Sequence, residues 1–412
     1  MITKQFIAEH LNDDVRELAL KYSNAKVDMA LALRQIEARQ ILRKKVPSWS
    51  DNEDLLFPAH LSIEQCSSEE AARYKTSLLH GQTFTDLTGG FGVDCYFISK
   101  NFQHTDYVEL NPELCALAEH NFAVLAESDA SLPPFGSVSP SGLRAERSNP
   151  LTIHNESAEE YLTHCPPVDV IFLDPARRDQ HGHKTVSIAD CTPNVLEIQD
   201  ALLSKARRIM VKLSPMLDIS KASRELHCVK EVHVVAVANE CKELLFIMEP
   251  GFAEEPVVTC VNLQTEQPIV KFGLDEIRHC EGGATEEIHD YLYEPNAALM
   301  KAGCFGLLSH RYGIMELHPN SHLFTSKQLV PDFPGRVFTV EGWAPYNKKI
   351  RQTLLAGVEK ASIAARNFPI SVAELRKSLR IADGDEVFLF ATTLKGEQKV
   401  IISTRKTRKF GK

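Results

Sequence analysis

Apolar residues recur at helical spacing in the first part of the chain. The clearest run extends over Val27–Leu42, and a shorter one covers Val15–Tyr22. Ser67 or Ser68 is expected to cap a further helix, because a serine before an acidic first turn is typical of a helix N-terminus. We therefore expect residues 1–80 to form an N-terminal helical region.

From residue 81 to about residue 250 the pattern changes to short apolar runs separated by helical stretches. Such an alternation predicts a parallel sheet with helices on both faces. The last two runs are separated only by residues 238–243, so these two strands are expected to pair antiparallel at an edge of the sheet. The predicted strands are Thr83–Leu87, Asp106–Glu109, Leu151–His154, Val168–Leu173, Arg208–Leu213, Glu231–Val237 and Leu244–Met248.

The rest of the chain predicts a smaller α+β arrangement. Residues 251–334 form a connecting region with strands near Val257–Leu263 and Tyr291–Tyr293 and a helix over Asn296–His310. Residues 335–412 are close to a ferredoxin-like unit. Its expected elements are a strand over 337–340, a helix over 349–366, a strand at 369–370, a helix over 372–379 and strands over 386–392 and 399–403.

Composition and length are those of a soluble globular protein. The 412 residues are 43% hydrophobic and 25% charged, which favours roughly two to four domains. Because we find neither a signal-peptide core nor an uncharged apolar run long enough to span a membrane, we expect a cytoplasmic protein without membrane contact. The ten cysteines are scattered without Cys-x-x-Cys spacing, and His181-Gly-His183 alone is weak evidence for a ligand pair, so no metal site is expected.

Charge is distributed unevenly along the chain. Residues 335–412 hold 16 Lys and Arg against 7 Asp and Glu, a local net charge of +9, which leaves −18 for the rest of a chain whose total is −9. A basic module beside an acidic body is typical of contact with a nucleic-acid backbone. A solvated surface would give the same count.

A glycine-rich segment follows the first predicted strand. Asp86-Leu-Thr88-Gly89-Gly90-Phe-Gly92-Val-Asp94 leads from that strand into a helix. Glycine lets the backbone approach a ligand and adopt positive φ, and the helix start offers N–H groups to a carboxylate.

An acidic residue follows the second predicted strand. Glu109 comes 23 residues after Asp86, where an acid in a βαβ unit binds ribose hydroxyls. A dinucleotide site would need Gly or Ala as the third small residue of Gly90-Phe-Gly92-Val-Asp-Cys95, and this chain has cysteine there. The pattern therefore disfavours NAD.

The fourth predicted strand runs into Asp174-Pro175-Ala176-Arg177. Open α/β sheets bind their ligands at the carboxyl ends of the strands, so this loop should face the glycine-rich segment.

Together these residues resemble the class I S-adenosylmethionine-dependent methyltransferases, in particular the bacterial RNA-methylase-like group with a C-terminal THUMP-like module. The resemblance covers about residues 60–250 and extends in part to 335–412. It implies a Rossmann-like, mostly parallel sheet over 81–250 with an antiparallel edge strand, an N-terminal helical region and a C-terminal ferredoxin-like domain.

The resemblance also assigns the cofactor residues. It implies that the Asp86–Asp94 loop holds the methionine part of S-adenosylmethionine, with Thr88 in place of the first family glycine. It implies that Glu109 holds the ribose, that Leu110 flanks the adenine, and that Glu156 or Ser157 contacts the adenine edge.

By the same resemblance, Asp174, Pro175 and Arg177 stand at the catalytic Asp-Pro-Pro-aromatic tetrapeptide of enzymes that methylate nitrogen. Ala176 and Arg177 replace the second proline and the aromatic residue. Enzymes that methylate carbon 5 of pyrimidines need a cysteine after the fifth strand, where this chain has Val211-Lys-Leu-Ser-Pro215. Lys212 in that segment either faces the site or lies on the surface.

The expected function is therefore methyl transfer from S-adenosylmethionine to a base nitrogen in tRNA or rRNA, with RNA bound by the basic C-terminal domain. Two alternatives remain open at this point. One is a methyltransferase for a protein or small molecule, and the other is a non-catalytic protein that binds the cofactor and RNA.

Overall fold

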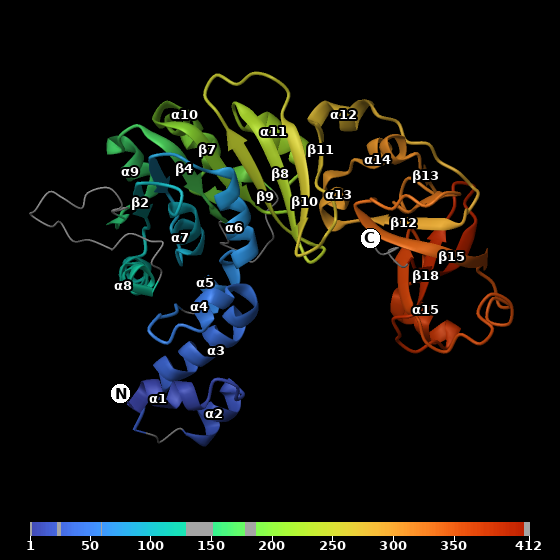
Figure 1. Cartoon of the computed structure of the whole chain (residues 1–412), viewed down its shortest axis with the longest axis horizontal. Coiled ribbons are helices and arrows are strands. Elements are labelled where there is room, and N and C mark those ends of the chain that lie inside the picture. Colours follow the sequence, from blue (N-terminus) through green and yellow to red (C-terminus); the bar gives the residue numbers. More distant parts are fainter. Residues whose placement is uncertain (1, 23–25, 59, 129–150, 178–186, 408–412) are drawn as a thin grey trace, which may run out of the picture. The chain divides into compact units, whose positions relative to one another are not determined.

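The computed structural model describes residues 2–22, 26–58, 60–128, 151–177 and 187–407 (Figure 1). The chain divides into two compact units, residues 1–230 with 244–254, and residues 231–243 with 255–412. Within the described ranges, none of the helices combines the length and the apolar character needed to cross a membrane.

Short helices form the start of the first unit. They bury a small apolar cluster that includes Phe6, Leu18, Ala32 and Ile36. The predicted cap of the last one is confirmed for Ser68, whose hydroxyl accepts a hydrogen bond from the backbone of Ala71. The helices are α1 (Ile2–Glu9), α2 (Val15–Lys21), α3 (Met29–Lys45), α4 (Pro47–Ser50), α5 (His60–Gln65) and α6 (Glu69–Leu78).

A mostly parallel sheet forms the core of the first unit. Strands β3, β2, β1, β4 and β7 pair in parallel in that order, and β9 pairs antiparallel with β7. This strand order confirms the predicted sheet. Its central strands are short and almost entirely buried, which is typical of a parallel sheet covered on both faces. The strands are β1 (Thr83–Asp86), β2 (His104–Val108), β3 (Leu151–His154), β4 (Val168–Leu173), β7 (Ala206–Leu213) and β9 (Glu240–Met248).

Helices and a short strand pair connect these strands. The helices are α7 (Val93–Ser99), α8 (Pro112–Ser128), α9 (Ala158–His164), α10 (Val195–Lys205) and α11 (Ile219–Glu225) (Figure 1). Between β4 and α10 lie β5 (Ala176–Arg177), the 3-10 turn Ile188–Asp190 and β6 (Cys191–Thr192), which pairs antiparallel with β5.

The expectation that the last two predicted strands lie at an edge of the sheet is wrong. The strand order is β11-β10-β8-β9-β7-β4-β1-β2-β3, so β8 (Val229–Val237) is an inner strand. β10 (Val257–Leu263) pairs in parallel with β8, and β11 (Val270–Gly273) pairs antiparallel with β10. β8 is buried along most of its length. An edge position would leave one side of this strand uncovered, and β10 covers that side.

A second sheet with the order β13-β14-β12-β15-β18-β17-β16 organises the rest of the second unit. Two apolar cores pack on it, one around Leu375 and Ile401 and one around Phe338 and Phe390. Its elements are α12 (Leu274–His279), β12 (Tyr291–Pro295), α13 (Ala297–Ala302), α14 (Phe305–Tyr312), β13 (Met315–Glu316), β14 (Phe324–Ser326), β15 (Gly335–Pro345), β16 (Ser362–Arg366), α15 (Val372–Leu379), β17 (Val387–Thr393) and β18 (Lys399–Lys406).

Three predicted elements in this unit are wrong. No helix covers 349–366; turns lead to Gly357, whose φ is +81°, and the chain then enters β16, where buried Ile363 joins the apolar core. Residues 369–370 form a bend rather than a strand. The helix predicted over 296–310 is divided into α13 and α14 because Gly303 adopts a φ of +69° and ends the first helix.

Candidate functional site

The glycine-rich segment forms a tight turn from β1 into α7. The Thr88 N–H donates to Asp86 Oδ1 at 3.0 Å, and the Gly89 N–H donates to the carbonyl of Val108 at 2.9 Å. Gly90 and Gly92 have φ values of +56° and +89°, which favour glycine. The loop is thus hydrogen-bonded to both β1 and β2, which holds it at the carboxyl ends of these strands.

Gly89 is a glycine for lack of space. A Cβ at this position would lie 2.1 Å from the nearest ring carbon of Tyr107, which is completely buried. The Tyr107 hydroxyl donates to the carbonyl oxygen of Gly90 at 2.6 Å. The tyrosine ring therefore supports the loop from below, and the loop must contain glycine to rest on it.

Asp86 lies at the end of β1 and is 1% exposed. Burial raises the pKa of its carboxyl well above the ordinary value, and the nearby carboxylates Asp94, Asp174 and Glu109 add to this rise, while the hydrogen bond from Thr88 opposes it. Four acidic side chains therefore influence one another at this end of the sheet.

Glu109 lies beside the glycine-rich loop, as the spacing predicted. Its Oε2 accepts a hydrogen bond from the Gly90 N–H at 2.9 Å, and its Oε1 accepts one from the Asn111 N–H at 2.8 Å. Leu110 is 66% exposed, and Asn155 binds the carbonyl oxygens of Glu109 and Leu110 at 2.9 and 3.0 Å. The carboxylate of Glu109 and the backbone of Leu110 are thus held beside the loop, and the Leu110 side chain is exposed there.

Glu156 and Ser157 follow β3 and have partners of their own. The Ser157 hydroxyl caps α9 by accepting from the Glu160 N–H at 3.1 Å, and the Glu160 side chain completes the capping box. Glu156 Oε2 is hydrogen-bonded to His164 Nε2 at 2.8 Å. Ser157 has a structural role as a helix cap.

Asp174 follows β4 and is joined to the glycine-rich loop. Its N–H donates to the Thr88 hydroxyl at 2.6 Å, and Pro175 after it is buried. The backbone of Arg177 pairs with Cys191 between β5 and β6. The structure describes no side chain for Arg177, and His181 and His183 lie outside the described residues.

Lys212 faces the site and does not lie on the surface. Its side chain is 11% exposed, and its ammonium lies 2.6 Å from Asp174 Oδ2 and 3.5 Å from Asp94 Oδ2. The register explains this position, because Leu173 of β4 pairs with Val211 of β7 and the next residues along both strands are Asp174 and Lys212. The pairing of strands far apart in sequence, rather than any local motif, brings Lys212 into the site.

Lys75 and Ser67 are two residues of the site that the sequence did not reveal. Lys75 on α6 has no exposed surface, and its ammonium lies 3.1 Å from Asp94 Oδ1. The Ser67 hydroxyl donates to Asp94 Oδ2 at 2.7 Å and accepts from Lys75 and Lys212, both at 3.0 Å. Burial acts to raise the pKa of Asp94, but the two lysines lower it below its ordinary value. We call Lys75, Ser67, Asp94, Lys212 and Asp174 the two-lysine network.

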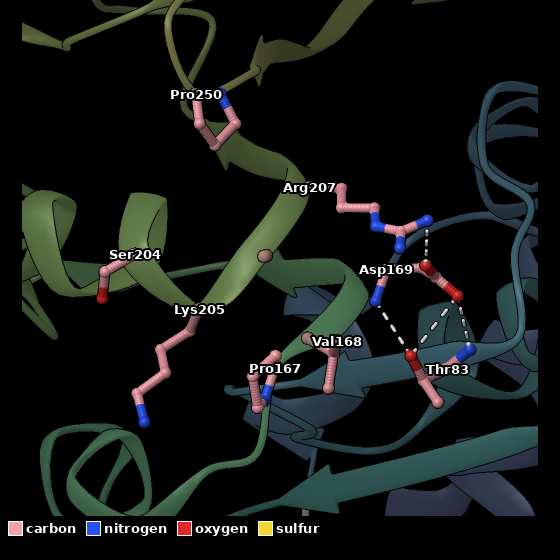
Figure 2. A pocket seen from close by; sticks show the side chains of 9 residues that line it. Thr83, Pro167, Val168, Asp169, Ser204, Lys205, Arg207 and Pro250 are labelled. Carbon is pink, nitrogen blue, oxygen red and sulfur yellow. Dashed lines mark hydrogen bonds and ion pairs between the residues drawn. The ribbon is translucent and has the colours of Figure 1, made fainter.

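The opposite end of the same sheet has a shallow hollow of about 450 Å³ (Figure 2). Residues at the starts of β1, β4 and β7 line it. One of them, Asp169, accepts a hydrogen bond from the Gln82 N–H at 2.7 Å and forms an ion pair with Arg207 at 3.4 Å. These contacts tie strand starts together. Ligands of open α/β sheets bind at the carboxyl ends, which is where the glycine-rich loop and Asp174 lie. Among the described residues there is no group of three or more His, Cys, Asp or Glu side chains able to hold a metal ion.

Two family models match the second unit. A ferredoxin-like domain matches residues 291–334, and a THUMP domain-like model matches residues 335–406. No curated protein matches the chain.

Solved structures give a further comparison. A candidate methyltransferase from Porphyromonas gingivalis W83 is 33% identical, with a TM-score of 0.82, over 99% of this chain and 98% of that chain. An rRNA methylase from Streptococcus thermophilus is 11% identical, with a TM-score of 0.29, over 44% of this chain and 94% of that chain. M. capricolum TrmK in complex with S-adenosyl-homocysteine is 10% identical, with a TM-score of 0.30, over 50% of this chain and 72% of that chain.

The first of these relatives spans nearly the whole of both chains, and the glycine-rich loop, the acid after β2 and the Asp-Pro loop meet at one end of the sheet. The protein therefore belongs to the class I, S-adenosylmethionine-dependent methyltransferases that carry ferredoxin-like and THUMP-like segments at the C-terminus.

Proposed function

We propose that this methyltransferase transfers a methyl group to a nitrogen of a base in RNA. The observation that carries the proposal is the position of Asp174, at the carboxyl end of β4 and hydrogen-bonded through its N–H to Thr88 of the glycine-rich loop. An acceptor bound by the Asp174 carboxylate would therefore lie next to a ligand held by that loop.

The residues of the loop fit S-adenosylmethionine. Gly89 and Gly90 present backbone without side chains, and Glu109 is held beside them at the position of a ribose-binding acid. In the proposed complex, Asp86, Thr88 and the glycines hold the methionine part, and Leu110 and Glu156 flank the adenine. Asp94 and Ser157 act through the backbone they support, since one is bound to two lysines and the other caps α9.

S-adenosylmethionine supplies a methyl group on a sulfonium, which is already electrophilic. The protein must then align the acceptor and manage one proton. The Asp174 side chain is 37% exposed, and its Oδ2 is bound to Lys212. We assign to the other oxygen of Asp174 the role of accepting a hydrogen bond from the acceptor N–H.

RNA is the proposed acceptor because of the second unit. A THUMP domain-like model matches residues 335–406, and residues 335–412 have a net charge of +9. Glu294 on β12, 3% exposed, holds the guanidinium groups of Arg336 at 2.6 Å and Arg366 at 2.8 Å. Two arginines and one glutamate give this group a net charge of +1. The arginine side chains are 40% and 39% exposed, so their N–H groups can face phosphate.

Methyl transfer from radiolabelled S-adenosylmethionine to separated RNA, protein and small-molecule pools tests the proposal. We expect label in RNA with the wild-type chain and none with Asp174→Asn, while calorimetry shows equal cofactor affinity for both. Label that appears only in protein or in small molecules would overturn the RNA assignment. Cofactor binding without transfer to any pool would indicate a non-catalytic protein.

A further inference from the structure

The site places more negative charge together than its chemistry needs. Asp86, Asp174 and Glu109 lie at the carboxyl ends of neighbouring strands, and Asp94 lies in the first turn of α7, which follows the glycine-rich loop. Unscreened carboxylates this close raise one another's pKa and draw protons from solvent. A carboxylate that is to take up a proton from the acceptor must be ionised beforehand, and a cation at ion-pair distance favours that form.

Lys212 is the cation that contacts Asp174. Its ammonium is almost buried and lies 2.6 Å from Asp174 Oδ2, closer than its distance of 3.5 Å to Asp94 Oδ2. A lysine is expensive to bury, and it remains charged there only with partners at close range. Here those partners are Asp174, Asp94 and the Ser67 hydroxyl.

The second lysine completes this arrangement. Lys75 lies behind Asp94 and binds its Oδ1, while Lys212 reaches its Oδ2 at the longer distance of 3.5 Å. Two ammonium groups thus face two carboxylates, and the network is neutral as a whole. Cys66 beside it contributes no charge, because burial raises the pKa of its thiol to about 11.

We propose that Lys212 is a positioning residue for methyl transfer. It keeps Asp174 ionised among the other acids and binds one of its two oxygens, so that the second oxygen points to the acceptor. The inference rests on the proposed function insofar as Asp174 binds the acceptor N–H. In the step, the bond from methyl carbon to sulfur breaks with its electron pair on sulfur, the bond from nitrogen to methyl carbon forms, and the acceptor proton passes to Asp174. Lys212 keeps its proton throughout.

A purely structural lysine is the competing explanation. Such a lysine would hold β4 and β7 together, and its loss would lower stability and cofactor affinity without changing the ionisation of Asp174. The pH dependence separates the two. Loss of the ammonium 2.6 Å from Asp174 removes an attraction that favours the carboxylate form, so the acidic limb of the kcat profile should move to higher pH only if Lys212 acts on Asp174.

The test uses the full chain with three variants. Lys212→Met removes the charge at similar volume, and Lys212→Arg restores it. Lys205→Met is the matched control, because Lys205 lies just before the opposite end of β7 and binds only a carbonyl oxygen in the contact that the structure gives, that of Cys165 at 2.7 Å. For each variant, kcat and KM are measured against pH with the pool that accepts the methyl group, alongside thermal unfolding and cofactor calorimetry.

We expect Lys212→Met to lower kcat by about 10- to 100-fold, within the range of general acid–base contributions. The acidic limb of its kcat profile should move to higher pH, cofactor affinity should stay within about threefold, and Lys212→Arg should recover most of the rate. An unchanged profile for Lys212→Met, or a loss that thermal unfolding or cofactor affinity accounts for in full, would overturn the proposal.

A measurement without any acceptor keeps this inference separate from the proposed function. Aspartate labelled with ¹³C at the carboxyl carbon reports the titration of Asp174, which Asp174→Asn assigns. We expect its midpoint to rise in Lys212→Met and to stay in place in Lys205→Met. If the wild-type chain methylates no RNA but this shift occurs, the RNA assignment fails and the role of Lys212 stands. If RNA is methylated and the midpoint does not move, the role of Lys212 is refuted.

Discussion

Gly89→Ala should be among the most damaging single-methyl additions in this chain. The new Cβ would lie 2.1 and 2.4 Å from two ring carbons of Tyr107, far inside van der Waals contact. The ring is fully buried, and its hydroxyl donates to Gly90 at 2.6 Å. Either the loop or the ring must move, and both movements break that hydrogen bond.

The size of the effect follows from these contacts. Overpacking a rigid core costs about 1–3 kcal/mol. Loss of the hydrogen bond from Tyr107 adds about 0.5–1.5 kcal/mol. We therefore expect Gly89→Ala to lower the free energy of unfolding by roughly 1.5–4.5 kcal/mol. Because Gly90 also binds Glu109, the displaced loop should lose cofactor affinity as well.

Gly90→Ala is the matched control, since its Cβ would meet only the carbonyl oxygen of Thr88 at 3.6 Å. It has the strain of a φ of +56° but no clash, and should cost about 1–2 kcal/mol. Urea unfolding followed by Trp49 fluorescence measures both variants in a Trp343→Phe background, because the chain has two tryptophans and Trp49 packs on Phe91 of the loop at 5.1 Å.

Tyr107→Leu supplies the decisive comparison. Leucine removes the ring atoms that the new methyl would strike, so Gly89→Ala should cost less in the Tyr107→Leu background than in the wild type by about 1–2 kcal/mol. Equal costs in the two backgrounds would show that the ring does not limit position 89. A loss for Gly89→Ala no larger than that for Gly90→Ala would refute the steric argument in the same way.

Three further predictions concern single contacts. Thr88→Val leaves the Asp174 N–H without its acceptor and should lower the rate of methyl transfer and cost about 1–3 kcal/mol of stability, measured by kinetics and urea unfolding. Burial raises the pKa of Asp86, so the contribution of this group to folding stability is fully present below its unfolded pKa of about 3.9 and is lost as pH rises toward its folded pKa. Asp86→Asn should therefore gain thermal stability relative to wild type from pH 5 to pH 8 while losing cofactor affinity. A constant difference in thermal stability across this range would contradict the reasoning. Arg336→Gln combined with Arg366→Gln should weaken RNA binding and reduce its salt dependence by up to two phosphate contacts, and an unchanged salt slope would exclude this pair from the interface.

Much of the first unit could be predicted because its signals are local. β3 and β4 have the bounds that their apolar runs predict, and the glycine-rich loop and Glu109 lie together as their spacing requires. Each of these depends on a few consecutive residues and on the strand–helix alternation that fixes which ends of the strands meet.

Several of the errors and omissions have non-local causes. The run over 349–366 has helical spacing, yet Gly357 interrupts it with a φ of +81°. Ile363 then lies in β16, where it pairs with β17. The inner position of β8 depends on β10, which comes some twenty residues later. Lys75 is an ordinary residue of a predicted helix, and only the packing of α6 against α7 places it on Asp94.

Thr88 shows how a departure from a family pattern can carry information that the pattern hides. Glycine at this position would still offer the N–H that binds Asp86, but it has no hydroxyl for the Asp174 N–H. With threonine, one residue binds the buried side chain of Asp86 through its N–H and the backbone N–H of Asp174 through its hydroxyl. Because Lys212 of β7 binds the side chain of the same residue, Asp174 is held by both the glycine-rich loop and β7. An Asp-Pro loop that lacks the second proline has lost one source of rigidity, and these two contacts supply another.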